Sequence, residues 1–193
     1  MTNETRNREI TSSNSIYIGE DVLKKIITVE TPHLLIPRIN LFGTQTATEY
    51  SSNKRRLVES ALTKQGINFL TEHPILTCAV TKPEETALYI IDGHHRARYS
   101  GRFRIFNIPC LVITLSELAQ ALIQDQQDVS ENILTEENLL SKLITDSAEA
   151  IISFSKLRED KYPRVIRGIS TLQELITKFQ SFTSNLTNRE TIY

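Results

Sequence analysis

Two strongly apolar stretches joined by a short polar turn constrain the fold of this chain more than any other feature. The stretches are HPILTCAV (73–80) and TALYIID (86–92), and the turn between them is TKPEE. Short runs rich in apolar and β-branched residues, bounded by a turn that contains proline, are typical of paired strands. We therefore predict an antiparallel hairpin at the centre of the fold.

Two further segments add strands to this hairpin. FNIPCLVITL (106–115) is strongly apolar and predicts a last strand of the sheet. HLLIPRINL (33–41) also favours a strand, and Pro37 places it at an edge or introduces a bend.

Two segments between the strands favour helices. NKRRLVESALTKQG (53–66) can be capped by Ser51 or Ser52 and ended by Gly66. HHRARYS (94–100) follows the second strand of the hairpin directly. Together these segments predict a compact α/β fold whose elements run β, α, β, β, α, β.

After Leu115 helical periodicity dominates. TEENLLSKLITDSAEAIISFSKLRE (135–159) places its apolar residues on one broad helix face, and Ser170 with Gln173 resembles a capping box for a last helix. The segment EDVLKKIITVE (20–30) fits a helix or a strand equally well. We expect three units, namely a flexible polar tail, an α/β core and a helical C-terminal extension, over residues 1–19, 20–115 and 116–193.

Net charge, apolar runs and cysteine spacing limit the classes of protein to which this chain can belong. The formal net charge is -1, so no overall field draws the chain to DNA or to an anionic membrane. No apolar run approaches a membrane span, the N-terminus has no secretory signal, and Cys78 and Cys110 have neither disulfide nor metal spacing. We expect a cytoplasmic protein without a membrane partner.

The basic run at 156–168 fits a solvated loop, with a nucleic-acid contact as the alternative.

The chemistry is concentrated where the second hairpin strand ends, in the sequence DGHHR. Gly93 removes a side chain where an anion would approach, and the free N–H groups of the next helical turn favour a phosphate. Arg96, His94 and His95 can add donors to its oxygens. Asp92 can hold Mg²⁺ or accept a proton. In the structural alternative, Asp92 caps the helix and the histidines pack or face water.

DGHHRARYSG followed by IPCLVI resembles the ParB/sulfiredoxin fold family over roughly residues 33–115. Within that family, DGHHR looks most like the ADP-dependent free serine kinases. Sulfiredoxins carry a reactive cysteine where this chain has His94, and ParB proteins carry GERR where it has GHHR. Both departures favour the kinase branch.

The resemblance implies a role for each residue of the motif. Gly93, His94, His95 and Arg96 would hold the diphosphate of ADP or ATP, and Asp92 would orient the acceptor hydroxyl with or without Mg²⁺. The kinases also use a loop glutamate, and Glu49 matches it by position better than Glu30 or Glu72. An exposed loop glutamate is an equally good interpretation of Glu49. The candidate catalytic residues are Asp92, Glu49 and His95.

Three functions follow. The first is phosphoryl transfer from a nucleotide to the hydroxyl of serine or a serine-like compound. The second is a non-catalytic nucleotide-binding switch whose C-terminal helices contact a protein or DNA partner. The third is a ParB-like nuclease or DNA-binding module, which the charge and the altered motif disfavour.

Overall fold

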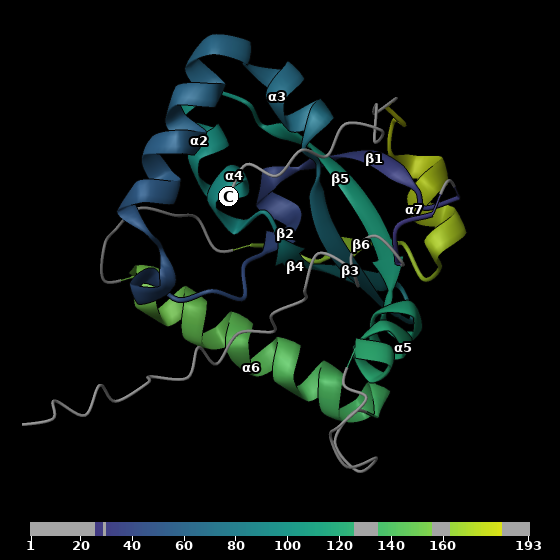
Figure 1. Ribbon diagram of the computed structural model, residues 1–193. Coiled ribbons are helices and arrows are strands. Elements are labelled where there is room, and N and C mark those ends of the chain that lie inside the picture. Colours follow the sequence, from purple (N-terminus) through teal and green to yellow (C-terminus); the bar gives the residue numbers. More distant parts are fainter. Residues whose placement is uncertain (1–25, 29, 126–134, 156–162, 183–193) are drawn as a thin grey trace, which may run out of the picture.

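The computed structural model describes residues 26–28, 30–125, 135–155 and 163–182, and it shows a mixed α/β fold built on one sheet (Figure 1). The strand order is β1-β5-β3-β4-β2, and β6 pairs with β4 beyond this path. The strands are β1 (His33–Pro37), β2 (Leu41–Phe42), β3 (Ile75–Lys82), β4 (Glu85–Asp92), β5 (Asn107–Thr114) and β6 (Ile166–Arg167).

Helices surround this sheet. The α-helices are α2 (Ser52–Gln65), α3 (Ile67–Glu72), α4 (His94–Ser100), α5 (Leu115–Asp125), α6 (Glu136–Ser155) and α7 (Leu172–Lys178). Three short 3₁₀ helices are η1 (Arg38–Asn40), η2 (Ala47–Glu49) and η3 (Gly101–Phe103). The predicted order β, α, β, β, α, β is confirmed for β1, α2, β3, β4, α4 and β5, whereas β2, α3 and the 3₁₀ helices were not predicted.

The predicted hairpin is the centre of the sheet. β3 and β4 pair antiparallel, from Lys82 opposite Glu85 to Leu76 opposite Asp92. β5 lies parallel to β3, β1 pairs antiparallel with β5, and the two-residue β2 pairs parallel with β4. β1 ends at Pro37, as the bend predicted there requires.

Both faces of the hairpin are buried because alternate residues pack into two separate hydrophobic clusters. Cys78 and Tyr89 belong to the cluster with the apolar residues of α5 and α6, whereas Ala79 and Leu88 belong to the cluster with α4 and α7. Figure 1 shows α5 and α6 along one side of the sheet and α7 beside β1. β4, with helices on both faces, is thus a rigid support for whatever follows Asp92.

α2 has the predicted N-cap, Ser51, and ends at the predicted residue, Gly66. The Ser51 side chain accepts a hydrogen bond from the Lys54 N–H, and Gly66 has a positive φ of 58° at the end of α2. Sequence reasoning was wrong about the cap of α7. Thr171 and Glu174, one residue further along than Ser170 and Gln173, form its capping box.

The C-terminal part of the chain does more than add helices. β6 joins the edge of the sheet at β4, and Leu175 of α7 is fully buried in the core beneath β1 and β4. α6 buries Leu139 and Leu143, but Ile144, Ala148 and Ile152 are exposed. The single broad apolar face predicted for this helix is therefore wrong at these three residues. The predicted tail, residues 1–19, and the basic positions 156–162 lie outside the described residues.

Candidate functional site

The strand–glycine–helix corner is formed as predicted. β4 ends at Asp92, Gly93 takes the left-handed conformation with a φ of 94°, and α4 begins at His94. A Cβ atom on Gly93 would lie 2.9 Å from Nη2 of Arg96 and 3.1 Å from Cγ1 of Ile75. Both the backbone conformation and the close approach therefore require glycine at this position.

Asp92 and Arg96 form an ion pair on the first turn of α4. Nη2 of Arg96 donates to Oδ2 of Asp92 at 2.8 Å and also lies 3.4 Å from the carbonyl oxygen of Pro74. Burial alone would raise the pKa of Asp92, but the charge and hydrogen bond of Arg96 outweigh it and hold that pKa below its ordinary value. The Asp92 carboxylate is therefore ionised at neutral pH, and its side chain is 34% exposed.

His94, the first residue of α4, is buried, with 4% of its surface exposed. Its Nε2 accepts a hydrogen bond from the Thr44 N–H at 3.2 Å and lies 2.9 Å from the Thr44 hydroxyl. That hydroxyl also donates to the Ile90 carbonyl oxygen at 2.9 Å. Burial lowers the pKa of His94 to about 4, although the charges of Asp92 and Glu49 both oppose the shift. His94 is thus a neutral acceptor that holds the loop at Thr44.

His95 holds the other end of the same loop. Its Nε2 accepts from the backbone N–H of Ser51 at 3.1 Å, and its ring lies 4.6 Å from the ring of Tyr50. Burial, followed by the charge of Lys54, lowers the pKa of His95 to about 4. In this structure the Nε2 atoms of both histidines face the loop from Thr44 to Ser51, and the phosphate contacts expected of them stay predictions.

Glu49 lies within this loop, at the end of η2. Its Oε2 accepts from the Thr46 N–H at 2.6 Å and from the Thr46 hydroxyl at 2.9 Å, which makes it the acidic half of a capping box. The loop is tied to α6 as well, since the Ala47 N–H donates to Oγ of Ser153 at 3.0 Å. Glu49 is half-buried and near enough to His94 to affect its pKa, so it is not the exposed loop glutamate of the alternative interpretation.

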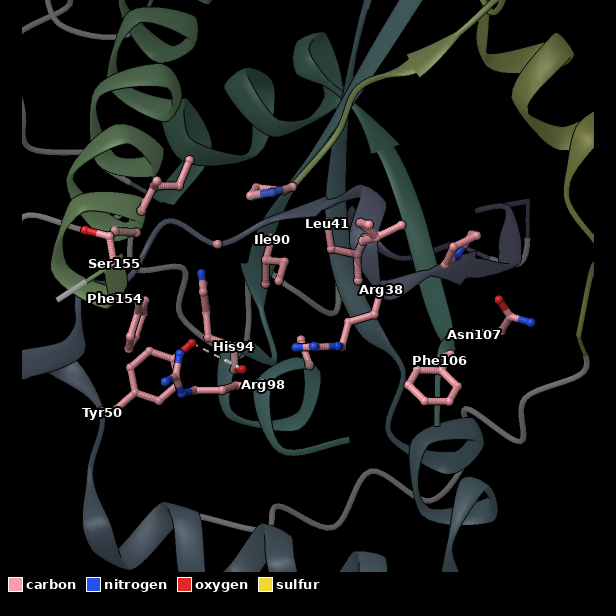
Figure 2. Close-up of a pocket in the computed structure, with 17 residues that line it drawn as sticks. Arg38, Leu41, Tyr50, Ile90, His94, Arg98, Phe106, Asn107, Phe154 and Ser155 are labelled. Carbon is pink, nitrogen blue, oxygen red and sulfur yellow. Dashed lines mark hydrogen bonds between the residues drawn. The ribbon is translucent and has the colours of Figure 1, made fainter. Parts of the chain in front are cut away.

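A cavity of about 650 Å³ opens beside α4, on the side where His94 lies (Figure 2). It is bounded by the chain from β1 to β2, by α4, by the start of β5 and by the C-terminal end of α6. Its lining residues are Pro37, Arg38, Ile39, Leu41, Gly43, Tyr50, Ile90, His94, Ala97, Arg98, Phe106, Asn107, Ala150, Ile151, Phe154, Ser155 and Pro163.

Of the predicted site residues, only His94 lines this cavity. Asp92, Gly93 and Arg96 lie at the corner outside it. Glu49 belongs to the loop beside it, and His95 is the residue of α4 that binds the end of this loop. Sequence reasoning missed Arg38 and Phe154, which come from segments far apart in the chain, and no local pattern marks them. Arg98 was not among the predicted site residues either.

No group of three or more histidine, cysteine, aspartate or glutamate side chains within the described ranges is placed to hold a metal ion. Mg²⁺ at Asp92 therefore stays a prediction.

Within the residues that the structure describes, every helix is too short or too polar to cross a membrane.

The chain matches no protein-family model, and no curated protein sequence matches it significantly.

Proposed function

We propose that this protein has a core of the ParB/sulfiredoxin type, binds ADP or ATP at the β4–α4 corner, and transfers a phosphoryl group to the hydroxyl of a small molecule. The observation that carries the proposal is the ionised Asp92 at the end of β4, held by Arg96 and followed directly by a left-handed glycine and a helix. Serine is the first acceptor to test because the DGHHR motif resembles that of free serine kinases.

The chemistry of Asp92 suits a phosphotransferase. Phosphoryl transfer depends chiefly on positioning and on neutralising charge, and a fixed carboxylate can orient the acceptor hydroxyl or hold Mg²⁺ against the phosphates. Asp92 is charged at neutral pH, its side chain is partly exposed, and its ion pair with Arg96 fixes its orientation. Asp92 is the last residue of β4, and only Gly93 separates it from the start of α4, where free backbone N–H groups favour an anion.

A second candidate is nucleotide binding without catalysis, and the engagement of the other predicted catalytic groups favours it. Glu49 accepts two hydrogen bonds from Thr46, and His95 accepts one from the Ser51 N–H. Catalysis by these two residues would require the loop between Thr44 and Ser51 to rearrange. In a switch, nucleotide binding would change this loop and the adjacent α6, and no acceptor would be needed.

Product analysis separates the two candidates. The purified protein is incubated with ADP or ATP, Mg²⁺ and serine, and phosphorylated product is followed by mass spectrometry. The kinase predicts product from the native protein and at least a hundredfold less from Asp92→Asn, in line with the loss of a catalytic acid–base group. Glu72→Gln, on the exposed part of α3, is the matched control and should retain full activity.

Each other outcome has a defined meaning. Nucleotide binding without product, over a panel of hydroxyl-bearing acceptors, would overturn the kinase and support the switch. Equal activity of Asp92→Asn and the native protein would show that the corner is not the catalytic centre.

A further inference from the structure

The outward face of α6 carries an apolar stripe. Leu139 and Leu143, on the inward face, are buried in the cluster that α6 shares with α5 and the sheet. On the outward face, Ile144 and Ile152 are exposed by 45% and 59%, and Ala148 between them is exposed as well. Residues at this four-residue spacing lie on one side of a helix. α6, which runs along one side of the fold in Figure 1, therefore has a second apolar face.

The order of side chains in this stripe is the same in both directions from Ala148. Ile144 and Ile152 lie four residues before and after it, and Ser141 and Ser155 lie seven residues before and after it. Both serines are also exposed, and none of the five side chains carries a charge. On an ideal helix these positions fall within about 40° of the direction of Ala148, and they form a line about 21 Å long.

A stripe with this symmetry is complementary to itself. If a second copy lies antiparallel across it, with the two-fold axis at Ala148, Ile144 faces the partner's Ile152 and Ser141 faces the partner's Ser155. Every contact along the stripe then joins two residues of one type. At the axis, the small Ala148 side chain lets the helices approach to about 8 Å, the close end of the usual range for packed helices. An apolar partner of unrelated sequence would not require this symmetry.

We propose that the outward face of α6 is the interface of a two-fold symmetric dimer, in which two copies of this chain pack antiparallel. The interface residues are Ser141, Ile144, Ala148, Ile152 and Ser155. One helix from each copy buries less than the roughly 800 Å² per partner of a standard interface, so the dimer is reversible and depends on concentration. This inference does not rest on nucleotide binding or on phosphoryl transfer, and either can fail without the other.

A single cysteine at the two-fold axis tests the surface. Cys78 and Cys110 are buried, so an introduced cysteine on α6 is the accessible thiol among the described residues. Ala148→Cys should form an intermolecular disulfide on mild oxidation, because the axis brings the two Cα atoms within the roughly 4.4–6.8 Å that a disulfide requires. Ser60→Cys, at an exposed position of α2, is the matched control and should remain a free thiol.

Two further variants establish the orientation of the helices. The antiparallel arrangement predicts a disulfide when Ser141→Cys and Ser155→Cys are mixed. Either variant alone should give about tenfold less, because Ser141 and the partner's Ser141 lie about 21 Å apart along the helices. A parallel arrangement would reverse this result and would overturn the proposed symmetry.

Sedimentation velocity over a concentration series up to about 1 mM measures the dimer without cross-linking. The native protein should shift from monomer to dimer. Ala148→Glu should weaken dimerisation at least tenfold, because two like charges would meet at the axis. Leu57→Glu adds the same charge at an apolar position of α2 that is exposed by 52%, and it should dimerise as the native protein does.

Circular dichroism confirms that each variant is folded. The inference is overturned if the native protein stays monomeric throughout the series, or if folded Ala148→Glu retains native dimerisation. It is also overturned if the Ala148→Cys thiol of a monomeric protein resists a maleimide, since another part of the same chain would then cover the stripe.

Discussion

The Nε2 atom of His95 accepts a hydrogen bond from the backbone N–H of Ser51, the N-cap of α2, at 3.1 Å. One turn of α4 thereby fixes the start of another helix. His94 makes the equivalent bond to the Thr44 N–H at 3.2 Å, so the two adjacent histidines hold both ends of one loop. Each bond requires an unprotonated Nε2, and the loop is therefore sensitive to acid.

Acid should weaken the fold through these histidines. Both have a pKa lowered from 6.5 to about 4, mainly by burial, so the unfolded chain binds protons more readily between these values. The free energy of unfolding should be at its full value above about pH 6.5 and should fall as the pH drops toward 4. Urea unfolding at half-unit pH intervals measures this dependence.

His95→Gln tests the origin of that slope. Glutamine can accept from the Ser51 N–H without titrating in this range, so the slope between pH 6.5 and 4 should become shallower. His73→Gln removes a histidine outside the loop and serves as the control. An unchanged slope in His95→Gln would show that His95 does not contribute to it.

Gly93→Ala should destabilise the protein by about 1–3 kcal/mol, because alanine is strained at a positive φ and its Cβ meets Arg96 and Ile75. Gly43→Ala is the matched control, since an added Cβ there has no heavy atom within 4 Å. Chemical denaturation of the three proteins makes the comparison. Equal losses in both variants would contradict the close approach at Gly93.

Arg96→Met should raise the pKa of Asp92. With the guanidinium removed, burial disfavours the carboxylate without the opposing charge that now lies 2.8 Å away. Carbon-detected NMR of the Asp92 carboxyl group follows the titration directly. Arg102→Met, which instead breaks an ion pair with Glu59, should leave the pKa of Asp92 unchanged.

Glu174→Ala should destabilise the protein by roughly 0.5–2 kcal/mol because it removes half of the capping box of α7, which packs Leu175 into the core. Gln173→Ala should be nearly neutral, since Gln173 is exposed and its side chain takes no part in the cap. Thermal unfolding distinguishes the two. A larger loss of stability in Gln173→Ala than in Glu174→Ala would contradict this cap and support the one predicted from the sequence, Ser170 with Gln173.

The elements that could be predicted from the sequence are those determined by local patterns. The hairpin has two apolar runs and a short turn, and α4 follows a glycine whose conformation only glycine readily adopts. The caps of α2 were equally visible, because Ser51 and Gly66 act on their immediate neighbours.

What could not be predicted depends on contacts between distant segments. β2 and β6 have two residues each and exist because the edge of β4 that faces away from β3 pairs with both of them. The partners of His94 and His95 lie 50 and 44 residues away along the chain, so the pattern DGHHR does not show that both rings face a loop. The cavity needs Arg38, Arg98 and Phe154 from three elements, and no spacing in the sequence links them.

Calorimetric titration of the full chain with ADP and Mg²⁺ tests the central claim most directly. The account predicts saturable binding by the native protein, loss of at least tenfold in affinity for Arg96→Ala, and native affinity for Arg102→Ala on the same stretch of chain. Absence of binding to ADP, ATP and CTP alike would contradict it. The corner at Asp92 would then have a structural role only.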